Sequence, residues 1–223
     1  MRTYPGRWHN LIGDGRRHGK HYVLCRDDGG RTSGYAIYRI EREHRYSAHG
    51  TVIVDHLMAC SGAAYRCLWV YMADLDLTDS VIASGRPERE PLRWALADSR
   101  QLVVTGIRDH LWVRLVDLPA ALSGRRYLAE GSLILDVADP FCPWNDGSWL
   151  LECGPDDAAC RPAAHSAPVN LRLDVAALGS LFLGGTSVAD LARTGRIEAD
   201  PVSLRRADEM FGAGTGPWCS TDF

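Results

Sequence analysis

The segment Gly85–Pro91 constrains the fold of this chain more than any other stretch, because it divides the chain into two parts. It reads GRPEREP and holds two prolines, one glycine and four charged residues. Such a cluster between apolar segments is typical of a domain boundary. The chain has 223 residues, which is long enough for two domains of ordinary size. We therefore predict one domain over residues 1–90 and a second over residues 91–223.

The first part carries the pattern of a small sheet with a helix. HYVLCR at residues 21–26 and SGYAIYRIE at residues 33–41 flank the turn DDGG, which predicts a β-hairpin. The β-branched run at residues 51–54 predicts a third strand. A helix should open at Ser61 and end near Asp74, because apolar residues recur between them at intervals of three and four. This order predicts the α+β class.

The second part also mixes strands and helices. Residues 111–116 alternate as a strand, and the next helix should run from Leu118 to Tyr127, with Asp117 as its N-cap and Pro119 in its first turn. Further apolar alternation predicts three strands, at residues 133–137, 149–152 and 171–175. Three short helices are expected near the end of the chain, at residues 178–185, 188–192 and 203–211.

Composition excludes several classes of partner. A net charge of −3 and a pI near 6.2 give no basic footprint, so we predict no nucleic-acid partner. There is no apolar run of about 18 residues and no signal-peptide pattern, which predicts a cytoplasmic protein without a membrane partner. The seven cysteines form no CxxC or CxxH pair. We therefore expect reduced thiols and no metal site.

The familiar cofactor and nucleophile motifs are missing from the sequence. It contains no GxxxxGK[ST], no GxGxxG between a strand and a helix, and no GxSxG. Among the titratable side chains, Asp109 and His110 are the candidate acid/base pair, because they directly precede the predicted strand at residues 111–116.

Aromatic residues are candidates for either the core or a pocket for a flat substrate. Trp69 and Trp112 are expected in the core. The other tryptophans suit either role, and a tyrosine could equally orient a planar ligand by stacking. Our candidate substrate-binding residues are Tyr38, Trp144, Trp149 and Trp218.

The terminal segment GTGPWCSTDF, residues 214–223, combines breakers of regular structure with two apolar anchors, Trp218 and Phe223. A frayed tail has no use for such anchors, so we predict that the segment docks onto the protein. Docking would carry the α-carboxylate of Phe223 inside, where it needs a polar partner or a catalytic role. The alternative is a simple apolar anchor whose terminus stays solvated.

Several blocks in fixed order resemble the Eis-type (enhanced intracellular survival) acetyltransferases, from about Arg2 to Phe223. The blocks are RDDGGRTSGYAIYRI, LWVYMADLDL, RPEREPLRWALADSR, DHLWVRLVDLPAALSGRRY, DPFCPWNDGSWLLE, NLRLDVAALGSLFLGG and PWCSTDF. Members of that family have an N-terminal acetyl-CoA-binding GNAT domain, a central GNAT-like domain without cofactor, and a C-terminal domain with the sterol-carrier-protein fold. They acetylate amines, including those of aminoglycosides, and assemble as hexamers.

The resemblance begins part-way into the family's central domain. It implies that residues 1–90 are a partial GNAT-like mixed sheet, a remnant of that domain, and that residues 91–223 form a sterol-carrier-protein-like domain. The N-terminal domain, with its acetyl-CoA-binding loop and acid tyrosine, is expected to be absent. The resemblance also implies that the terminal carboxylate on Phe223 is a general base, with Trp218 in the aromatic shell around it.

Three functions follow from these expectations. The first is a cofactor-independent enzyme of secondary metabolism, in which the Phe223 carboxylate moves protons on an amine-bearing aromatic substrate during a condensation or cyclisation. The second is an amine or aminoglycoside N-acetyltransferase that works with a separate acetyl-CoA-binding chain. The third is a non-catalytic module for an apolar ligand. A homo-oligomer or a partner chain is expected, because a partial sheet leaves open edges.

Overall fold

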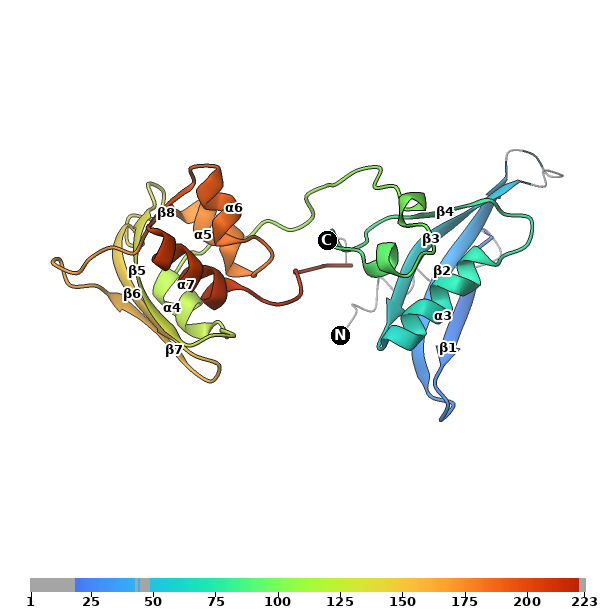
Figure 1. The fold of residues 1–223 in the computed structure, drawn as a ribbon, viewed down its shortest axis with the longest axis horizontal. Helices are drawn as coiled ribbons and strands as arrows, with labels where there is room; N and C mark the ends of the chain where they lie inside the picture. Colours follow the sequence, from blue (N-terminus) through green and yellow to red (C-terminus); the bar gives the residue numbers. More distant parts are fainter. Residues whose placement is uncertain (1–18, 43, 45–48, 221–223) are drawn as a thin grey trace. The chain divides into compact units, whose positions relative to one another are not determined.

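The structure is a computed structural model that describes residues 19–42, 44 and 49–220, and these form two compact units (Figure 1). Unit 1 contains the described residues up to Arg86, residues 90–105 and residues 219–220. Unit 2 contains residues 87–89 and 106–218. Each unit has its own sheet and its own hydrophobic core.

Unit 1 is built on a four-stranded sheet in the order β1-β2-β3-β4. Strand β1 (His21–Arg26) and β2 (Thr32–Arg42) form the predicted hairpin, and β3 (Gly50–Ala59) pairs antiparallel with β2. The helix α3 (Gly62–Ala73) then leads to β4 (Ser80–Ala83), which pairs parallel with β3. A helix is the usual crossover between parallel strands. Two short 3₁₀ turns follow, at Pro91–Trp94 and Ser99–Gln101.

Helix α3 begins where the sequence predicts, because the Ser61 side chain accepts a hydrogen bond from the Ala64 amide at 3.2 Å. It lays Leu68 and Met72 on the sheet. Close packing requires a glycine beneath it: a Cβ on Gly34 would lie 2.9 Å from the Met58 carbonyl oxygen and 3.1 Å from Leu68 Cδ1.

The sheet of unit 1 opens between β3 and β4. The two strands pair only from Thr51–Ser80 to Val54–Ala83, while β3 continues to Ala59. Directly after Val54, the pairing of β3 with β2 skips Asp55, which forms a β-bulge. Bulges bend and twist a strand. The second half of β3 therefore has β2 on one side only.

Unit 2 is built on a five-stranded sheet in the order β7-β6-β5-β8-β9. Its strands are β5 (Gly131–Ala138), β6 (Gly147–Cys153), β7 (Ala158–Pro162), β8 (Leu171–Asp174) and β9 (Ile197–Glu198). Strands β5 and β8 are parallel, and the other neighbours are antiparallel. The helices gather on one face of this sheet (Figure 1); they are α4 (Leu118–Gly124), α5 (Val175–Phe182), α6 (Val188–Arg193) and α7 (Pro201–Phe211).

The core of unit 2 lies between the sheet and these helices. Strand β5 contributes Leu133, Leu135 and Val137, the alternating residues that the sequence marks as inward-facing. Leu122 of α4 and Leu178 of α5 pack against this side of the sheet as part of the same cluster. The two units together confirm the α+β class predicted from the sequence.

The structure corrects several sequence predictions. Residues 111–116 form no strand, and Trp112, expected in the core, is 84 % exposed. The helix from Leu118 ends at Gly124 rather than Tyr127. Strands β4, β7 and β9 are not anticipated by the sequence pattern, since each is short and pairs at or near a sheet edge.

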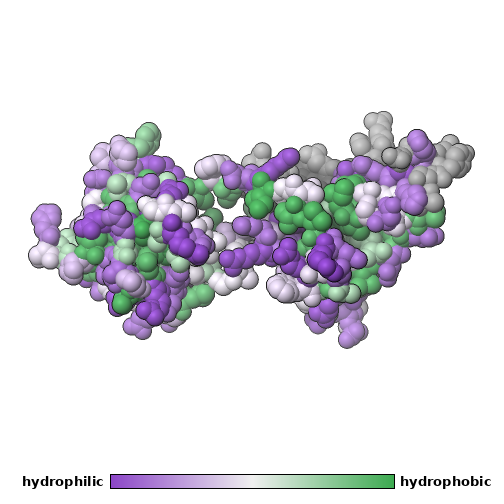
Figure 2. All heavy atoms as spheres, turned by 45° about the horizontal axis from the view of Figure 1, so that its top comes forward, coloured by the Kyte–Doolittle hydropathy of each residue, from purple (hydrophilic) through white to green (hydrophobic). Residues whose placement is uncertain are grey.

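Hydrophobic and hydrophilic residues are interspersed over the face of the molecule in Figure 2. Some large aromatic side chains are nonetheless strongly exposed, including Trp94 at 87 % and Phe141 at 79 %. None of the helices in the described part of the chain has the length and apolar character needed to cross a membrane.

Candidate functional site

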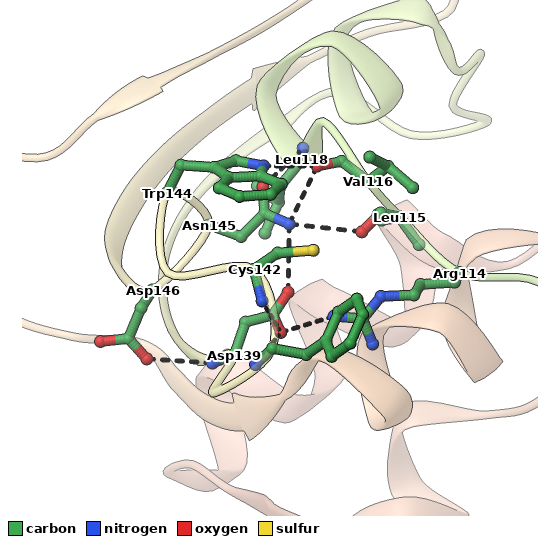
Figure 3. A network of polar contacts seen from close by, with 10 residues as sticks. Arg114, Leu115, Val116, Leu118, Asp139, Cys142, Trp144, Asn145 and Asp146 are labelled. Atoms are coloured by element: carbon green, nitrogen blue, oxygen red, sulfur yellow. Dashed lines mark hydrogen bonds and ion pairs between the residues drawn. The ribbon is translucent and has the colours of Figure 1, made fainter.

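A polar network in unit 2 surrounds the carboxylate of Asp139, which is 1 % exposed (Figure 3). Asp139 lies just after β5, and its Oδ1 accepts hydrogen bonds from Arg114 Nη2 at 2.6 Å and from the Cys142 amide at 3.0 Å. Burial acts to raise the pKa of Asp139, but the hydrogen bonds from Cys142, Asn145 and Arg114 outweigh it and lower the pKa. Asp139 is therefore held as a carboxylate.

Asn145 is the second buried member of the network and is fully enclosed. Its Oδ1 accepts from the Leu118 amide at 3.0 Å, at the start of α4. Its Nδ2 donates to Asp139 Oδ2 at 3.1 Å and to the carbonyls of Leu115 and Val116 at 3.3 and 3.2 Å. The side chain thus ties the segment before α4 to the loop between β5 and β6, which is a structural role.

Two predicted substrate-binding tryptophans flank this network. Trp144 is 61 % exposed, and its Nε1 donates to the Val116 carbonyl at 2.8 Å (Figure 3). Trp149 is 9 % exposed, belongs to the core of unit 2 and donates to the Asn145 carbonyl at 2.8 Å. Trp144 can offer a ring face to a ligand. Trp149 is a core residue, so its ring is not available as a pocket wall.

Tyr38 lies in unit 1, on β2 beside the bulge. It is 4 % exposed, and its hydroxyl is 2.9 Å from that of Tyr71 on α3. The ring stacks on His21, with 5.0 Å between centroids. Burial, the hydrogen bond to Tyr71 and the proximity of that phenol raise the pKa of Tyr38 to about 12. At neutral pH it is a neutral phenol that can donate or accept a hydrogen bond but cannot act as a base.

The opening in the sheet of unit 1 is bridged by Arg86. Its Nη1 donates to the Leu57 carbonyl at 2.8 Å, beyond the last β3–β4 pair, and its Nε donates to Glu90 Oε2 at 2.8 Å. The other oxygen of Glu90 accepts from the Tyr65 hydroxyl of α3. The Arg86 guanidinium also lies over the Trp69 ring, 5.7 Å from its centroid. The side chains of Arg86 and Glu90 are only 14 % and 12 % exposed.

The remaining predicted site residues lie apart from these features. Asp109 and His110 are exposed on the irregular segment before Leu111, not at the end of a strand. Trp218 is half-buried. Phe223 lies outside the described residues. The structure therefore brings Trp144 and Trp149 together around Asn145, while the described contacts do not join the other candidates to them.

The start of the terminal segment, up to Pro217, packs on unit 2 through residues that were not predicted from the sequence. Arg125 donates to the carbonyls of Phe182, Met210 and Phe211, at the ends of α5 and α7. A Cβ on Gly184 would lie 3.0 Å from the Ala213 amide, and one on Gly185 would lie 2.9 Å from Pro217 Cγ. The repeated glycine in LFLGG, followed later by GAGTGP, was the available signal of a close backbone approach.

The described residues contain no group of three or more His, Cys, Asp or Glu side chains that could hold a metal ion. The cysteines within that part of the chain are reduced thiols, and burial raises the pKa of Cys160 to about 11. Cys160 is thus unsuited to act as a nucleophile near neutral pH.

Comparisons with known proteins assign both parts of the chain. A family described as an acetyltransferase (GNAT) domain matches residues 3–115, and a sterol carrier protein domain matches residues 118–220. A GNAT domain is therefore present over residues 3–115, which corrects the expectation that the N-terminal GNAT domain is absent.

Relatives match this chain over most of its length. An uncharacterized N-acetyltransferase of Streptomyces avermitilis is 36% identical over 98% of this chain and 54% of its own length. The N-acetyltransferase Eis of Mycobacterium tuberculosis is 34% identical over 80% of this chain and 42% of its own. The crystal structure of Eis1 from Mycobacterium abscessus superposes with a TM-score of 0.79 at 34% identity, covering 97% of this chain and 54% of that one. The chain spans about half the length of the curated relatives it matches.

Proposed function

We propose a function from the premise that this chain belongs to the Eis-like GNAT acetyltransferases, in which a GNAT domain is joined to a sterol-carrier-protein domain. The chain takes part in N-acetylation of small-molecule amines, including aminoglycosides. The α-carboxylate of Phe223 is the general base, and the acetyl donor binds outside the described residues of unit 1.

The observation that carries this proposal is the packing of the tail on unit 2 as far as Pro217. Phe223 is the sixth residue after Pro217. Six residues reach at most about 20 Å when fully extended, so the carboxylate stays close to a fixed point of the protein. A tethered carboxylate is present near a bound amine at a high effective concentration.

The base has a defined task in this chemistry. If an amine attacked the acetyl carbon of a thioester donor, a C–N bond would form, the C–S bond of the donor would break to release its thiolate, and the nitrogen would lose a proton to give the neutral amide. The Phe223 carboxylate accepts that proton. Trp144, the exposed candidate aromatic of unit 2, offers a ring face for an aromatic or cationic amine.

GNAT acetyltransferases use acetyl-CoA, so the residues of unit 1 can be tested for their fit to it. The pantetheine arm of acetyl-CoA is a chain of amides, which an open strand edge would bind through its backbone groups. The edge of β3 beyond Val54 presents the Leu57 carbonyl, and Arg86 already occupies that acceptor. These described residues do not fit the arm of acetyl-CoA. This supports a donor site on a separate polypeptide or another segment.

The hydrogen bond from Arg86 to the Leu57 carbonyl also favours a second candidate function. This is a cofactor-independent enzyme in which the Phe223 carboxylate moves protons on an amine-bearing aromatic substrate during condensation or cyclisation. In both candidates the carboxylate does the same work. They differ in whether an acetyl group reaches the amine.

The experiment is an acetylation assay on a panel of aminoglycosides and aryl amines with acetyl-CoA, read by mass spectrometry. The wild-type chain is compared with a version extended by two glycines after Phe223 and with Phe223→Leu, which keeps a terminal carboxylate. We expect acetylated product to be lost on extension and retained in the leucine variant. Equal product from the extended chain would overturn the proposed base. Conversion of an amine without gain of an acetyl group would favour the second candidate.

A further inference from the structure

Two cysteines of unit 1 lie on elements that pack against each other. Cys25, near the end of β1, is 8 % exposed and belongs to the hydrophobic cluster beneath α3. Cys67 lies in α3 and is exposed. Helix α3 packs against β1 as well as against β2 and β3. The two cysteines therefore lie on facing elements, with one thiol open to solvent and the other shielded from it.

The helix approaches the sheet closely beside Cys25. Cys25 pairs with Gly34 on β2, and a Cβ on Gly34 would lie 3.1 Å from Leu68 Cδ1. Leu68 directly follows Cys67 in α3. A larger residue at position 34 would push the helix away from the sheet. Gly34 thus permits the short distance between helix and strand that a crosslink needs, since the Cα atoms of a disulfide lie about 4.4–6.8 Å apart.

The face of α3 that carries Cys67 is turned towards this side of the sheet. Cys67 and Tyr71 are four residues apart, so their side chains lie on the same face of the helix. The Tyr71 hydroxyl is 2.9 Å from that of Tyr38, which pairs with His21 of β1. The Cys67 thiol itself forms a hydrogen bond with the Cys25 thiol. The two sulfur atoms are therefore neighbours.

The surroundings of the two thiols give them different roles. Ser33 Oγ lies 3.7 Å from Cys25 Sγ, to which it can donate a hydrogen bond, and a donor at this position stabilises the thiolate of Cys25. The pKa of Cys67 is raised, chiefly by its hydrogen bond to Cys25, so Cys67 reacts slowly near neutral pH. Cys67 is nonetheless the thiol that a dissolved oxidant can reach, and Cys25 is placed to react with it afterwards.

We propose that Cys25 and Cys67 are a redox-sensitive pair that closes to a disulfide and links α3 covalently to β1. The oxidant is a low-molecular-weight disulfide. The Cys67 thiolate attacks one of its sulfurs, which forms a mixed disulfide and releases one thiolate of the oxidant. The Cys25 thiolate then attacks the Cys67 sulfur, so the Cys25–Cys67 bond forms and the second thiolate leaves. The protein loses two hydrogen atoms and is oxidised, while the oxidant is reduced to two thiols.

The crosslink would act on the edge of the sheet. Among the described strands, β1 pairs with β2 alone, so its other side is open. A bond between residues 25 and 67 closes a loop of about 40 residues that includes β2 and β3. Closing a loop of this length should raise the ratio of folded to unfolded unit 1 about a hundredfold or more.

Oxidised glutathione is the probe that tests the pair in the full chain. After incubation, the remaining thiols are alkylated and the peptides are mapped by mass spectrometry without reduction. We expect a linked pair of peptides that contains Cys25 and Cys67 and that separates on treatment with dithiothreitol. The link should be absent in Cys67→Ser and unchanged in the control Cys60→Ser. Cys60 is also exposed, but it follows β3, which β2 separates from β1.

Hydrogen exchange of the same samples measures what the link does. The peptide covering β1 should exchange about tenfold more slowly after oxidation of wild type and of Cys60→Ser, and at an unchanged rate in Cys67→Ser. Equal exchange before and after oxidation of wild type would overturn the proposed effect on β1. A lasting mixed disulfide of Cys67 with glutathione, a link to another cysteine or another chain, or two thiols that stay free would overturn the pair itself.

Discussion

Asn145 makes four hydrogen bonds with one side chain, three of them buried, so truncation of this residue should be costly. Asn145→Ala would leave the Leu118 amide, Asp139 Oδ2 and two backbone carbonyls without this partner. Since each stranded buried group costs about 1–3 kcal/mol, we expect a loss of at least about 3 kcal/mol of unfolding free energy. Urea denaturation followed by circular dichroism measures it.

Trp144→Phe is the matched control for this experiment. It removes a single hydrogen bond, from Trp144 Nε1 to the Val116 carbonyl, at a side chain that is 61 % exposed. We expect a loss below about 1 kcal/mol. Similar losses in the two variants would mean that Asn145 is not the centre of the network.

Tyr38 gives unit 1 a pH-dependent contribution at the alkaline end. Its pKa is raised to about 12, whereas an unfolded tyrosine ionises near 10. The native state therefore keeps a proton that the unfolded state gives up, and this stabilisation is complete below pH 10 and is lost as the pH rises towards 12. Thermal unfolding midpoints measured between pH 9 and 12 should fall less steeply for Tyr38→Phe than for wild type. Parallel pH profiles would be inconsistent with a buried Tyr38 hydroxyl.

Individual residues were only partly predictable from the sequence. The N-cap Asp117 and the helix start at Ser61 were expected from local chemistry and are present, because a cap depends on residues three positions away. Trp69 lies in the core as predicted, whereas Trp112, which was also expected there, is 84 % exposed. Asn145 lies in the sequence PWNDG, which predicts only a turn. Its partners on residues 115–118 are visible only in the fold.

At the scale of elements, the bridge across the sheet opening has the clearest mechanical role. Arg86→Ala would leave the Leu57 carbonyl and the Glu90 carboxylate without their partner in a half-buried place. We expect unit 1 to lose about 2–3 kcal/mol, somewhat less than for a fully buried ion pair.

Arg89→Ala belongs to the same motif but changes an exposed side chain, so it should leave stability within about 0.5 kcal/mol of wild type. Hydrogen exchange in β3 and denaturant unfolding measure the difference in stability between Arg86→Ala and Arg89→Ala. If Arg89→Ala were as destabilising as Arg86→Ala, the loss would reflect the charge of the motif rather than the bridge.

The contacts of Arg86 and Glu90 could not be predicted from the local sequence pattern. The motif GRPEREP predicts a boundary from its prolines and charges, but residues 90–105, which follow it, still belong to unit 1. Arg86 and Glu90, however, fold back onto β3 and α3. The hairpin β1–β2, helix α3 and the β5–β6 pair were predictable because their apolar period is local. The short strands β4 and β9 pair with strands far away in the sequence, and β7, although it directly follows its partner β6, is also short, so the apolar pattern of all three is too weak to predict them.

At the scale of the whole molecule, the donor site separates the two candidate functions. Titration calorimetry of the full chain with acetyl-CoA should give the same binding constant for wild type and Arg86→Ala, because the described edge of β3 does not hold the acetyl donor. Arg86→Ala and Arg89→Ala should be titrated in parallel. Micromolar binding by wild type would place a donor site in this chain and remove the need for a second polypeptide.

Assembly belongs to the same scale. We propose a homo-oligomer or a complex with a partner chain, supported by the exposed aromatic side chains Trp94, Trp112 and Phe141. Analytical ultracentrifugation over a range of concentrations should show a species heavier than the 24.6 kDa of one chain. A single 24.6 kDa species at every concentration would exclude the homo-oligomer.

The central claim is that the α-carboxylate of Phe223 is held in a site where it works as a base. It can be tested directly by labelling the phenylalanine carbonyl carbons with ¹³C and titrating the terminal carboxylate by NMR, with the free peptide GPWCSTDF as reference. We expect the titration curve of the carboxylate in the protein to differ from that of the peptide, because a docked terminus would be less hydrated than a free one. Identical titration curves and chemical shifts for protein and peptide would contradict the claim.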